Sequence, residues 1–152
     1  MSGAVWPDEL QLIPGGLAVD DRGSLSFIND FDLSTFARFY VVRNHSKGFI
    51  RAWHGHKNEA KGVMAIQGSA LVGGVKVDDW ASPSSDLPIE RFVLNSSKPS
   101  VLIIPPGYAN GFMSLSDDLV LMFFSSSTLE QSAGDDIRFP SRTWDAWKIE
   151  ER

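Results

Sequence analysis

The sequence of 152 residues contains no cysteine, so it can form no disulfide and carries neither a thiol nucleophile nor a thiolate metal ligand. Positive charge is scarce, with 14 Lys and Arg against 19 Asp and Glu, which argues against nucleic acid as a partner. The longest apolar run, Leu119–Phe124, is far too short to cross a bilayer, so we expect no membrane association. Met1–Glu9 lacks the basic start and apolar stretch of a signal peptide, and we expect a cytoplasmic protein.

Long amphipathic helices are also missing, because no long segment repeats apolar residues at the helical period. Short β-branched and aromatic runs instead alternate with turn residues, which is typical of a β-sandwich or closed barrel. We expect a single all-β domain over residues 1–152, with a core of about residues 20–129 and an irregular C-terminal segment, residues 130–152, packed on it. The predicted strands are Ser24–Asn29, Phe36–Arg43, Gly62–Gln67, Ala70–Val77, Ile89–Leu94, Val101–Ile104 and Leu119–Ser125.

Two histidines are the first candidates for chemistry. His54 and His56 are two residues apart, so on a strand their side chains share one face. Lys61 follows on the next predicted strand, and two imidazoles with a lysine nearby can act as base, orienting group and electrophile. Taken alone, a His-x-His pair is more often a pair of structural histidines on an exposed strand, and it is the Pro-Gly turn at residues 105–107 and the spacing to Gly68 that favour function.

Arg38 and Tyr40 form a second pair with the same spacing. If their face points into the barrel, the guanidinium suits a phosphate or a carbonyl oxygen, and the phenol can transfer a proton. The opposite face of this strand is apolar and is an equally good candidate for the core. The pair is therefore a weaker indication than the histidines.

The histidines and the turn at residues 105–107 resemble the metal motif of cupin barrels. In that motif His-x-His is followed by a Glu, and a His comes shortly after a Pro-x-Gly turn. Here Lys61 stands at the position of the Glu and Asn110 at that of the last His. An ammonium has no lone pair and repels a divalent cation, so we expect a cupin jelly roll, a double-stranded β-helix, without a metal or other cofactor.

The same motifs resemble the cupin-fold enzymes that act on nucleoside-diphosphate 4-keto-6-deoxy sugars. The dTDP-4-dehydrorhamnose 3,5-epimerases show Arg-Gly-x-His, a Lys at the head of the next strand, and Ile-Pro-x-Gly-x-Ala-His-Gly-Phe. The chain matches these with Arg51–His54, Lys61 and Ile104–Phe112. The 3,4-ketoisomerases show Asp-x-Arg-Gly-x-Leu, Arg-x-Tyr and Arg-Gly-x-His-x-His-Lys. The matching segments are Asp20–Leu25, Arg38–Tyr40 and Arg51–Lys57.

This resemblance implies a homodimer that isomerises or epimerises a nucleotide sugar, expected to be dTDP-linked, through an enolate. His54 would be the base, His56 a second proton carrier or orienting group, Lys61 the oxyanion stabiliser, and Tyr40 the second acid. The expected substrate-binding residues are Arg22, Arg38, Arg51, Asn110 and Tyr108, of which Arg22 and Arg38 would hold the diphosphate.

Two departures from the family pattern bear on the reaction. The epimerases use a Tyr as the acid opposite the base, and Leu121–Leu129 contains none. Their late Trp-Asn-Asp-Pro, which supplies the Asp behind the catalytic His, is not reproduced here, and Asp135–Pro140 is the nearest candidate. We therefore expect one shifted carbonyl, as in a 3,4-ketoisomerase, or one inverted centre. A non-catalytic sugar-nucleotide-binding cupin and a metal-dependent cupin enzyme are the alternatives.

Overall fold

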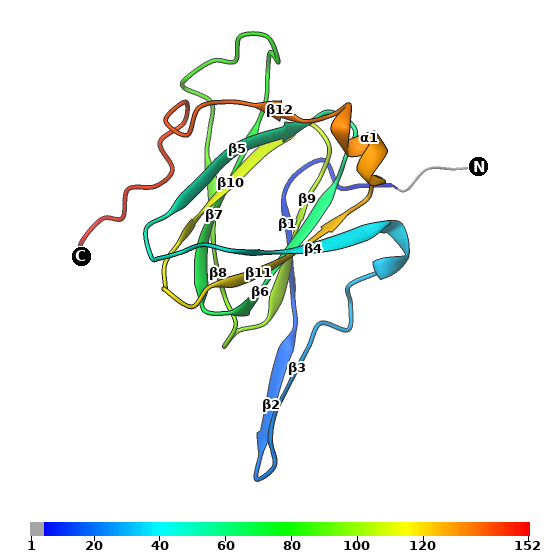
Figure 1. The fold of residues 1–152 in the computed structure, drawn as a ribbon, viewed down its shortest axis with the longest axis vertical. Coiled ribbons are helices and arrows are strands. Elements are labelled where there is room, and N and C mark those ends of the chain that lie inside the picture. The colour runs from blue at the N-terminus through cyan, green and yellow to red at the C-terminus, as the bar shows by residue number, and fades with distance from the viewer. Residues whose placement is uncertain (1–4) are drawn as a thin grey trace.

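The computed structural model describes residues 5–152, which form two five-stranded antiparallel sheets that face each other as a sandwich (Figure 1). Sheet I has the order β1 (Gln11–Pro14), β9 (Ser100–Ile104), β6 (Lys61–Gln67), β11 (Val120–Ser125), β4 (Arg38–Arg43). Sheet II has the order β12 (Ile137–Arg138), β5 (Ile50–His56), β10 (Tyr108–Ser114), β7 (Ser69–Lys76), β8 (Glu90–Asn95). The predicted all-β cupin fold is confirmed.

All seven predicted strands are present, as β3, β4, β6, β7, β8, β9 and β11, with ends shifted by a few residues. Strand β10 was not predicted, because its sequence combines Ala, Asn and Gly and is buried along its whole length. Small and turn-forming residues are depleted in strands generally, and a strand buried on both faces loses the alternation that reveals it. Strand β5 was inferred only from the spacing of its two histidines.

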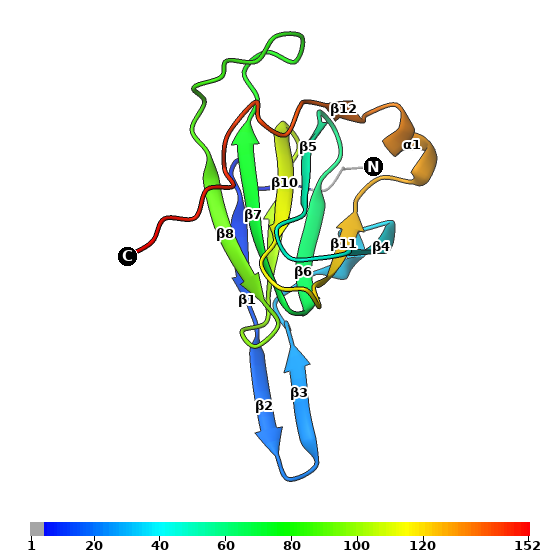
Figure 2. The same cartoon turned by 60° about the vertical axis from the view of Figure 1, so that its left-hand side comes forward.

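The space between the sheets is filled by a core of aliphatic and aromatic side chains from both layers, including Leu102, Leu121 and Phe123. A second cluster lies on the outer face of sheet II, where the C-terminal segment crosses the sheet (Figure 2). There Trp53 of β5 packs against Trp144 and Trp147, with ring centroids 5.4 and 5.1 Å away. Sheet II is thus covered on both sides.

Gly55 separates the two histidines of β5 and faces outward. A Cβ atom at this position would lie 2.5 Å from the ring of Trp80, so only glycine lets that ring lie against the strand. The short strand β12 pairs with the same stretch, with Ile137 opposite Gly55 and Arg138 opposite His54. The C-terminal segment therefore fixes the strand that carries both histidines.

Strands β2 (Gly16–Asp20) and β3 (Gly23–Phe27) form a separate hairpin that projects from the sandwich at the end opposite α1 (Leu129–Ala133) (Figure 1). A short 3-10 helix, η1 (Leu33–Thr35), links this hairpin to β4. No helix within residues 5–152 is long and apolar enough to span a membrane.

Candidate active site

A cavity of about 440 Å³ opens between the two sheets and is closed on one side by α1 and β12. Both sheets contribute to its walls, so side chains of opposite strands face one another across it. The lining residues are Arg38, Tyr40, Val42, Arg51, His54, His56, Glu59, Lys61, Asn110, Phe112, Phe123, Leu129, Ser132, Ala133, Asp136 and Arg138.

His54 forms the centre of the wall that sheet II provides. Its imidazole is half-buried, and burial lowers its pKa, with the nearby Arg138 guanidinium acting in the same direction and the Asp136 carboxylate opposing both. The imidazole is therefore neutral at neutral pH, as a general base requires. Asn110 donates a hydrogen bond from Nδ2 to the backbone oxygen of His54 over 3.3 Å, so it supports the strand behind the imidazole.

His56 lies deeper than His54 and is only 6% exposed. Its Nδ1 is 2.6 Å from the backbone oxygen of Asp135, and because a carbonyl only accepts, Nδ1 must carry the hydrogen. No group among residues 5–152 is placed to hydrogen-bond its buried Nε2. The ring is thus held in one tautomer, which suits an orienting role.

Lys61 and Tyr40 form the facing wall, on sheet I. Lys61 Nζ donates a hydrogen bond of 2.5 Å to the Tyr40 hydroxyl oxygen. The Tyr40 ring stacks on Phe123, with centroids 5.2 Å apart and planes 7° from parallel. The Arg38 guanidinium carbon lies 5.4 Å from the Tyr40 ring centroid. The phenol is therefore fixed by its neighbours on both sides.

The Tyr40–Phe123 stack bears on the tyrosine that is missing from Leu121–Leu129. Phe123 points into the cavity from β11, and β4 pairs with β11 so that Tyr40 lies directly opposite Phe123 in the ladder. A phenol is therefore present on this wall, one strand away from the segment in which the family pattern places it.

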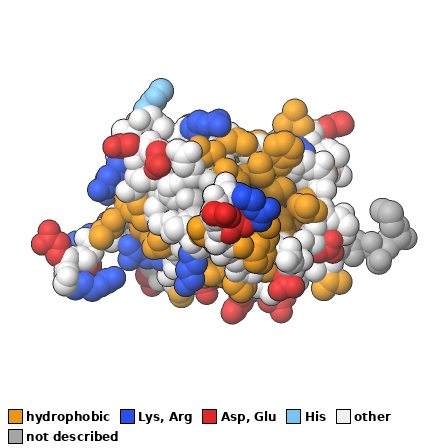
Figure 3. Space-filling model, turned by 90° about the horizontal axis from the view of Figure 1, so that it is seen from below, with side chains coloured by type: hydrophobic (Ala, Val, Ile, Leu, Met, Phe, Trp, Pro, Cys, Tyr) orange, Lys and Arg blue, Asp and Glu red, His pale blue; other side chains and the backbone are white. Residues whose placement is uncertain are grey.

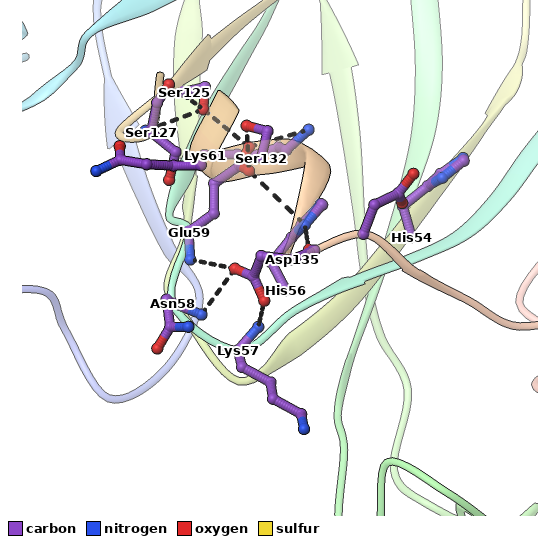
Figure 4. A network of polar contacts seen from close by, with 12 residues as sticks. His54, His56, Lys57, Asn58, Glu59, Lys61, Ser125, Ser127, Ser132 and Asp135 are labelled. Carbon is purple, nitrogen blue, oxygen red and sulfur yellow. Dashed lines mark hydrogen bonds and ion pairs between the residues drawn. The ribbon is translucent and has the colours of Figure 1, made fainter. Parts of the chain in front are cut away.

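Glu59 connects the elements around this wall and was not among the predicted site residues. Its carboxylate is 1% exposed and accepts hydrogen bonds from the hydroxyls of Ser125 and Ser132, at 2.8 and 2.7 Å (Figure 4). Lys61 Nζ lies 3.5 Å from one of its oxygens, and His56 Nδ1 lies 3.8 Å from the other. No local sequence pattern indicates this role, because Glu59 stands in a polar turn and its partners come from distant segments.

Asp135 fixes the turn on which Glu59 stands. Its carboxylate accepts hydrogen bonds from the backbone N–H groups of Lys57, Asn58 and Glu59, at 2.7–2.9 Å. Because its backbone oxygen also accepts from His56, Asp135 ties the segment after α1 to both ends of this turn. Of the stretch predicted to support the catalytic histidine, Asp135 thus contacts His56, and Asp136 influences the pKa of His54.

His56, Glu59 and Asp135 have potential ligand atoms within 4.8 Å of one another, close enough to share a metal ion. The Asp135 carboxylate is already engaged by three backbone donors. The Glu59 carboxylate is engaged by two hydroxyls, and the Lys61 ammonium would repel a divalent cation. These residues do not fit a metal ion, and they form a closed polar network instead.

The cavity brings together seven of the residues proposed from the sequence: His54, His56, Lys61, Tyr40, Arg38, Arg51 and Asn110. Two others lie elsewhere. Arg22 is at the tip of the β2–β3 hairpin, where it is ion-paired with Asp20, and Tyr108 is packed in the core with 4% exposure. Arg138, which the sequence did not indicate, joins the cavity because β12 pairs with β5.

Solved structures with the same fold include two epimerases and a ketoisomerase that act on sugars. A dTDP-4-dehydrorhamnose 3,5-epimerase from Bacillus anthracis, solved with TDP and pyrophosphate bound, superposes with a TM-score of 0.74 at 20% identity, over 93% of this chain and 86% of the other. A 4-keto-6-deoxy sugar epimerase from Streptomyces spheroides gives 0.74 at 17% identity, over 97% and 78%. A sugar 3,4-ketoisomerase from Thermoanaerobacterium thermosaccharolyticum, in complex with TDP, gives 0.66 at 21% identity, over 92% and 95%.

Comparison with curated protein sequences gave no match. The family model described as dTDP-4-dehydrorhamnose 3,5-epimerase, in contrast, matches residues 16–148, which include both sheets apart from β1 and every residue that lines the cavity. The chain therefore belongs to the dTDP-4-dehydrorhamnose 3,5-epimerase family, the cupin-fold epimerases and ketoisomerases of dTDP-4-keto-6-deoxyhexoses.

Proposed function

We propose that this protein inverts a single centre next to the ketone of a dTDP-linked 4-keto-6-deoxyhexose, by removing an α-proton and passing through an enolate without a metal. The observation that carries the proposal is the placement of His54 on one wall of the cavity and of the Lys61–Tyr40 pair on the facing wall. A proton can leave one face of the sugar and another can be delivered to the opposite face.

In the first step the neutral His54 imidazole takes the α-proton. Negative charge then develops on the ketone oxygen, where a positioned cation lowers the barrier, and Lys61 supplies such a cation from the cavity wall opposite His54. The burial that lowers the pKa of His54 keeps it in the form that accepts a proton.

In the second step Tyr40 protonates the enolate carbon from the other face. Lys61 donates its hydrogen bond to the Tyr40 oxygen, so the phenolic hydrogen remains available to the substrate. The same ammonium stabilises the phenolate that results, because opposite charges attract strongly in a site with little water. Arg38 and Arg51, both on the cavity wall, are our candidates to hold the diphosphate.

The product formed from dTDP-4-keto-6-deoxyglucose in heavy water tests this function. We expect one inverted centre that carries deuterium, as read by proton NMR. A product with the carbonyl at C3 would make the protein a 3,4-ketoisomerase. Inversion at both C3 and C5 would contradict the single-centre proposal, and binding of TDP without any exchange would identify a non-catalytic binding protein.

We also propose that the protein is a homodimer. The hairpin exposes Val19 and Leu25, with 72% and 65% of each residue accessible, and β4 at the edge of sheet I exposes Phe39, with 61%. Hydrophobic side chains gather at the end of the molecule from which the hairpin projects (Figure 3). Exposed apolar strands of this kind favour pairing with another chain.

Light scattering with Leu25→Asp tests the dimer: we expect the mass of a dimer for the wild type and of a monomer for the variant. A monomeric wild type would contradict this proposal. Arg22 lies away from the cavity of its own chain. It could therefore act as the predicted diphosphate ligand only in the cavity of a second copy.

A further inference from the structure

Glu59 is a buried carboxylate on the turn between β5 and β6, and the steps proposed above do not use it. Burying a carboxylate is unfavourable unless hydrogen bonds and opposite charge compensate. Glu59 has both, because Ser125 and Ser132 donate to its two oxygens and Lys61 Nζ lies 3.5 Å away. The Glu59 carboxylate is thus a fully compensated charge that lies next to the groups proposed to react.

The carboxylate is ionised in this environment. Burial raises the pKa of Glu59, but the hydrogen bond from Ser132 and the cation of Lys61 act in the opposite direction, with His56 and Ser125 adding to them. The lowering influences prevail, and the pKa lies below its ordinary value. Glu59 therefore places a negative charge behind the Lys61 ammonium.

The Lys61 ammonium is held between Glu59 and Tyr40. Its Nζ is 3.5 Å from Glu59 Oε2 and 2.5 Å from the Tyr40 oxygen, and it lies 5.0 Å from the Tyr40 ring centroid. A lysine side chain has four rotatable bonds, and both contacts are needed to fix its end. The ammonium thus lies between the Glu59 carboxylate, which its hydrogen bonds hold in place, and Tyr40, the candidate acid.

We propose that Glu59 is a positioning residue, which anchors the Lys61 ammonium against Tyr40 and so prepares both groups to act on the substrate from the wall opposite His54. The chemical part of this inference rests on the proposed function, but the anchoring can be measured without turnover. The role differs from that of the carboxylate predicted to support the histidine, because Glu59 contacts the lysine more closely than His56 and acts on the other wall.

Glu59 also contacts α1, and any effect of this contact must be distinguished from the effect of Glu59 on Lys61. Ser132 of α1 donates to Glu59 Oε1 and accepts a 2.7 Å hydrogen bond from Arg38 Nη2. Ser132→Ala breaks this link and leaves the Glu59–Lys61 ion pair in place. If Glu59 acted only by holding α1, the two substitutions would have the same effect.

The test is Glu59→Gln, which removes the charge and keeps the shape and a hydrogen-bonding oxygen. Around Lys61 the titratable and charged groups are Glu59, His56 and His54 from β5 and its turn, and Tyr40 and Arg38 from β4, with Asp135 next to Glu59. Glu59 is the anion nearest to Lys61, and removing its charge weakens the attraction on the ammonium, so Lys61 should lose its proton at a lower pH than in the wild type.

The primary readout is an NMR titration of the protein with 15N-labelled lysine, without substrate, and with the Lys61 signal assigned by its loss in Lys61→Met. In Glu59→Gln we expect Lys61 to titrate at lower pH, and in Ser132→Ala we expect it to behave as in the wild type. An unchanged Lys61 titration in Glu59→Gln would overturn the anchoring role. Glu59→Asp keeps the charge but moves it away from Lys61 by one methylene, so the Lys61 titration should shift by an intermediate amount. This variant provides the measurement if Glu59→Gln does not fold.

The second readout is turnover. We expect Glu59→Gln to lower kcat by about 10–100-fold, at or below the lower end of the range for losing an acid or base itself, because Glu59 acts only through Lys61, and to move the alkaline limb of kcat/KM to lower pH. Glu59→Asp should recover part of both, and TDP affinity should stay at the wild-type value. Glu90→Gln, the same change at an exposed site on β8, is the matched control and should leave everything unchanged.

The two readouts separate this inference from the proposed function. If Lys61 titrates as expected but neither protein exchanges protons with any dTDP-4-keto sugar, the anchoring holds and the proposed function fails. If the wild type is active and Glu59→Gln keeps its full kcat and its alkaline limb, the positioning role is wrong and the function stands.

Discussion

The two walls of the cavity are built in different ways. On sheet II the His54 imidazole is half-buried and has no hydrogen bond to any side chain among residues 5–152, and charged neighbours, first of all Arg138 and Asp136, act on it from a distance. On sheet I the Lys61 ammonium and the Tyr40 phenol are hydrogen-bonded to each other and backed by Glu59, which α1 contacts through Ser132.

The difference corresponds to the two chemical roles that we propose for the walls, proton removal on sheet II and stabilisation and reprotonation of the enolate on sheet I. A base needs a lone pair that the substrate can reach, and the His54 ring, which has no side-chain hydrogen bond among residues 5–152, can offer one to the cavity. A cation and an acid that meet developing negative charge are most effective when they are already oriented, because no reorganisation is then needed during the reaction. Substitutions on the two walls should therefore differ in which step they impair.

The strongest test of this comparison is His54→Asn. We expect deuterium exchange from heavy water into the substrate to fall by about 10²–10⁴-fold, the usual loss for a positioned general base. TDP affinity, measured by calorimetry, should stay at the wild-type value, because the imidazole is proposed to act on the sugar and not on the diphosphate. Exchange at the wild-type rate would exclude His54 as the base.

Tyr40→Phe should impair the second step and spare the first. The ring retains its stack on Phe123 and loses only the hydroxyl, so the fold should be unaffected. We expect product formation to fall by about 10²-fold, the lower end of the range for a general acid. Deuterium should still enter the recovered substrate, because His54 remains; an equal loss of exchange and product would show that the walls do not act separately.

The pH dependence of kcat/KM gives a third test. A base works when neutral, so activity is present above its pKa and is lost as the pH falls through it. Since burial and Arg138 lower the pKa of His54, the acid limb should lie below the ordinary imidazole value of about 6.5.

Asp136→Asn removes the one influence that opposes this lowering, so the acid limb should move to still lower pH. Activity at pH 7 should change by less than about twofold, because His54 is already neutral there. Asp145→Asn, an exposed aspartate paired with Arg142, serves as the control and should leave the limb in place. A shift to higher pH would contradict the assigned sign.

The smallest effect is expected from chelators. Because Lys61 and the engaged carboxylates of Glu59 and Asp135 do not fit a metal ion, dialysis against EDTA should change kcat by less than about twofold. Elemental analysis of the purified protein provides the second measurement. Stoichiometric zinc, iron or manganese bound through the histidines would reverse this interpretation.

The sequence predicted the parts of the site that follow from local spacing. His54 and His56 share a strand, and Arg38 and Tyr40 share the face that points into the cavity, since alternation along a strand can be read directly. The fold followed from the rhythm of strands and turns together with the resemblance of the motifs.

The rest of the site depends on contacts between distant segments. Glu59 meets Ser125 and Ser132, which are 66 and 73 residues further along the chain, and no local pattern indicates such pairs. Arg138 reaches the cavity only because the two-residue strand β12 adds to the edge of sheet II. The position of Arg22 also could not be predicted, because its turn motif does not reveal that the hairpin leaves the sandwich.

The C-terminal segment can cover Trp53 only after it has itself been synthesised, so part of β5 is exposed for a time on the nascent chain. Trp53, next to the proposed base, is covered by Trp147, which the ribosome adds 94 residues later, or about 5–20 s later at 5–20 residues per second. During that interval the outer face of β5 presents an indole that its final partner does not yet cover. A chain that terminates before Trp144 should therefore keep this surface exposed and be cut there by proteases faster than the chain that carries both tryptophans.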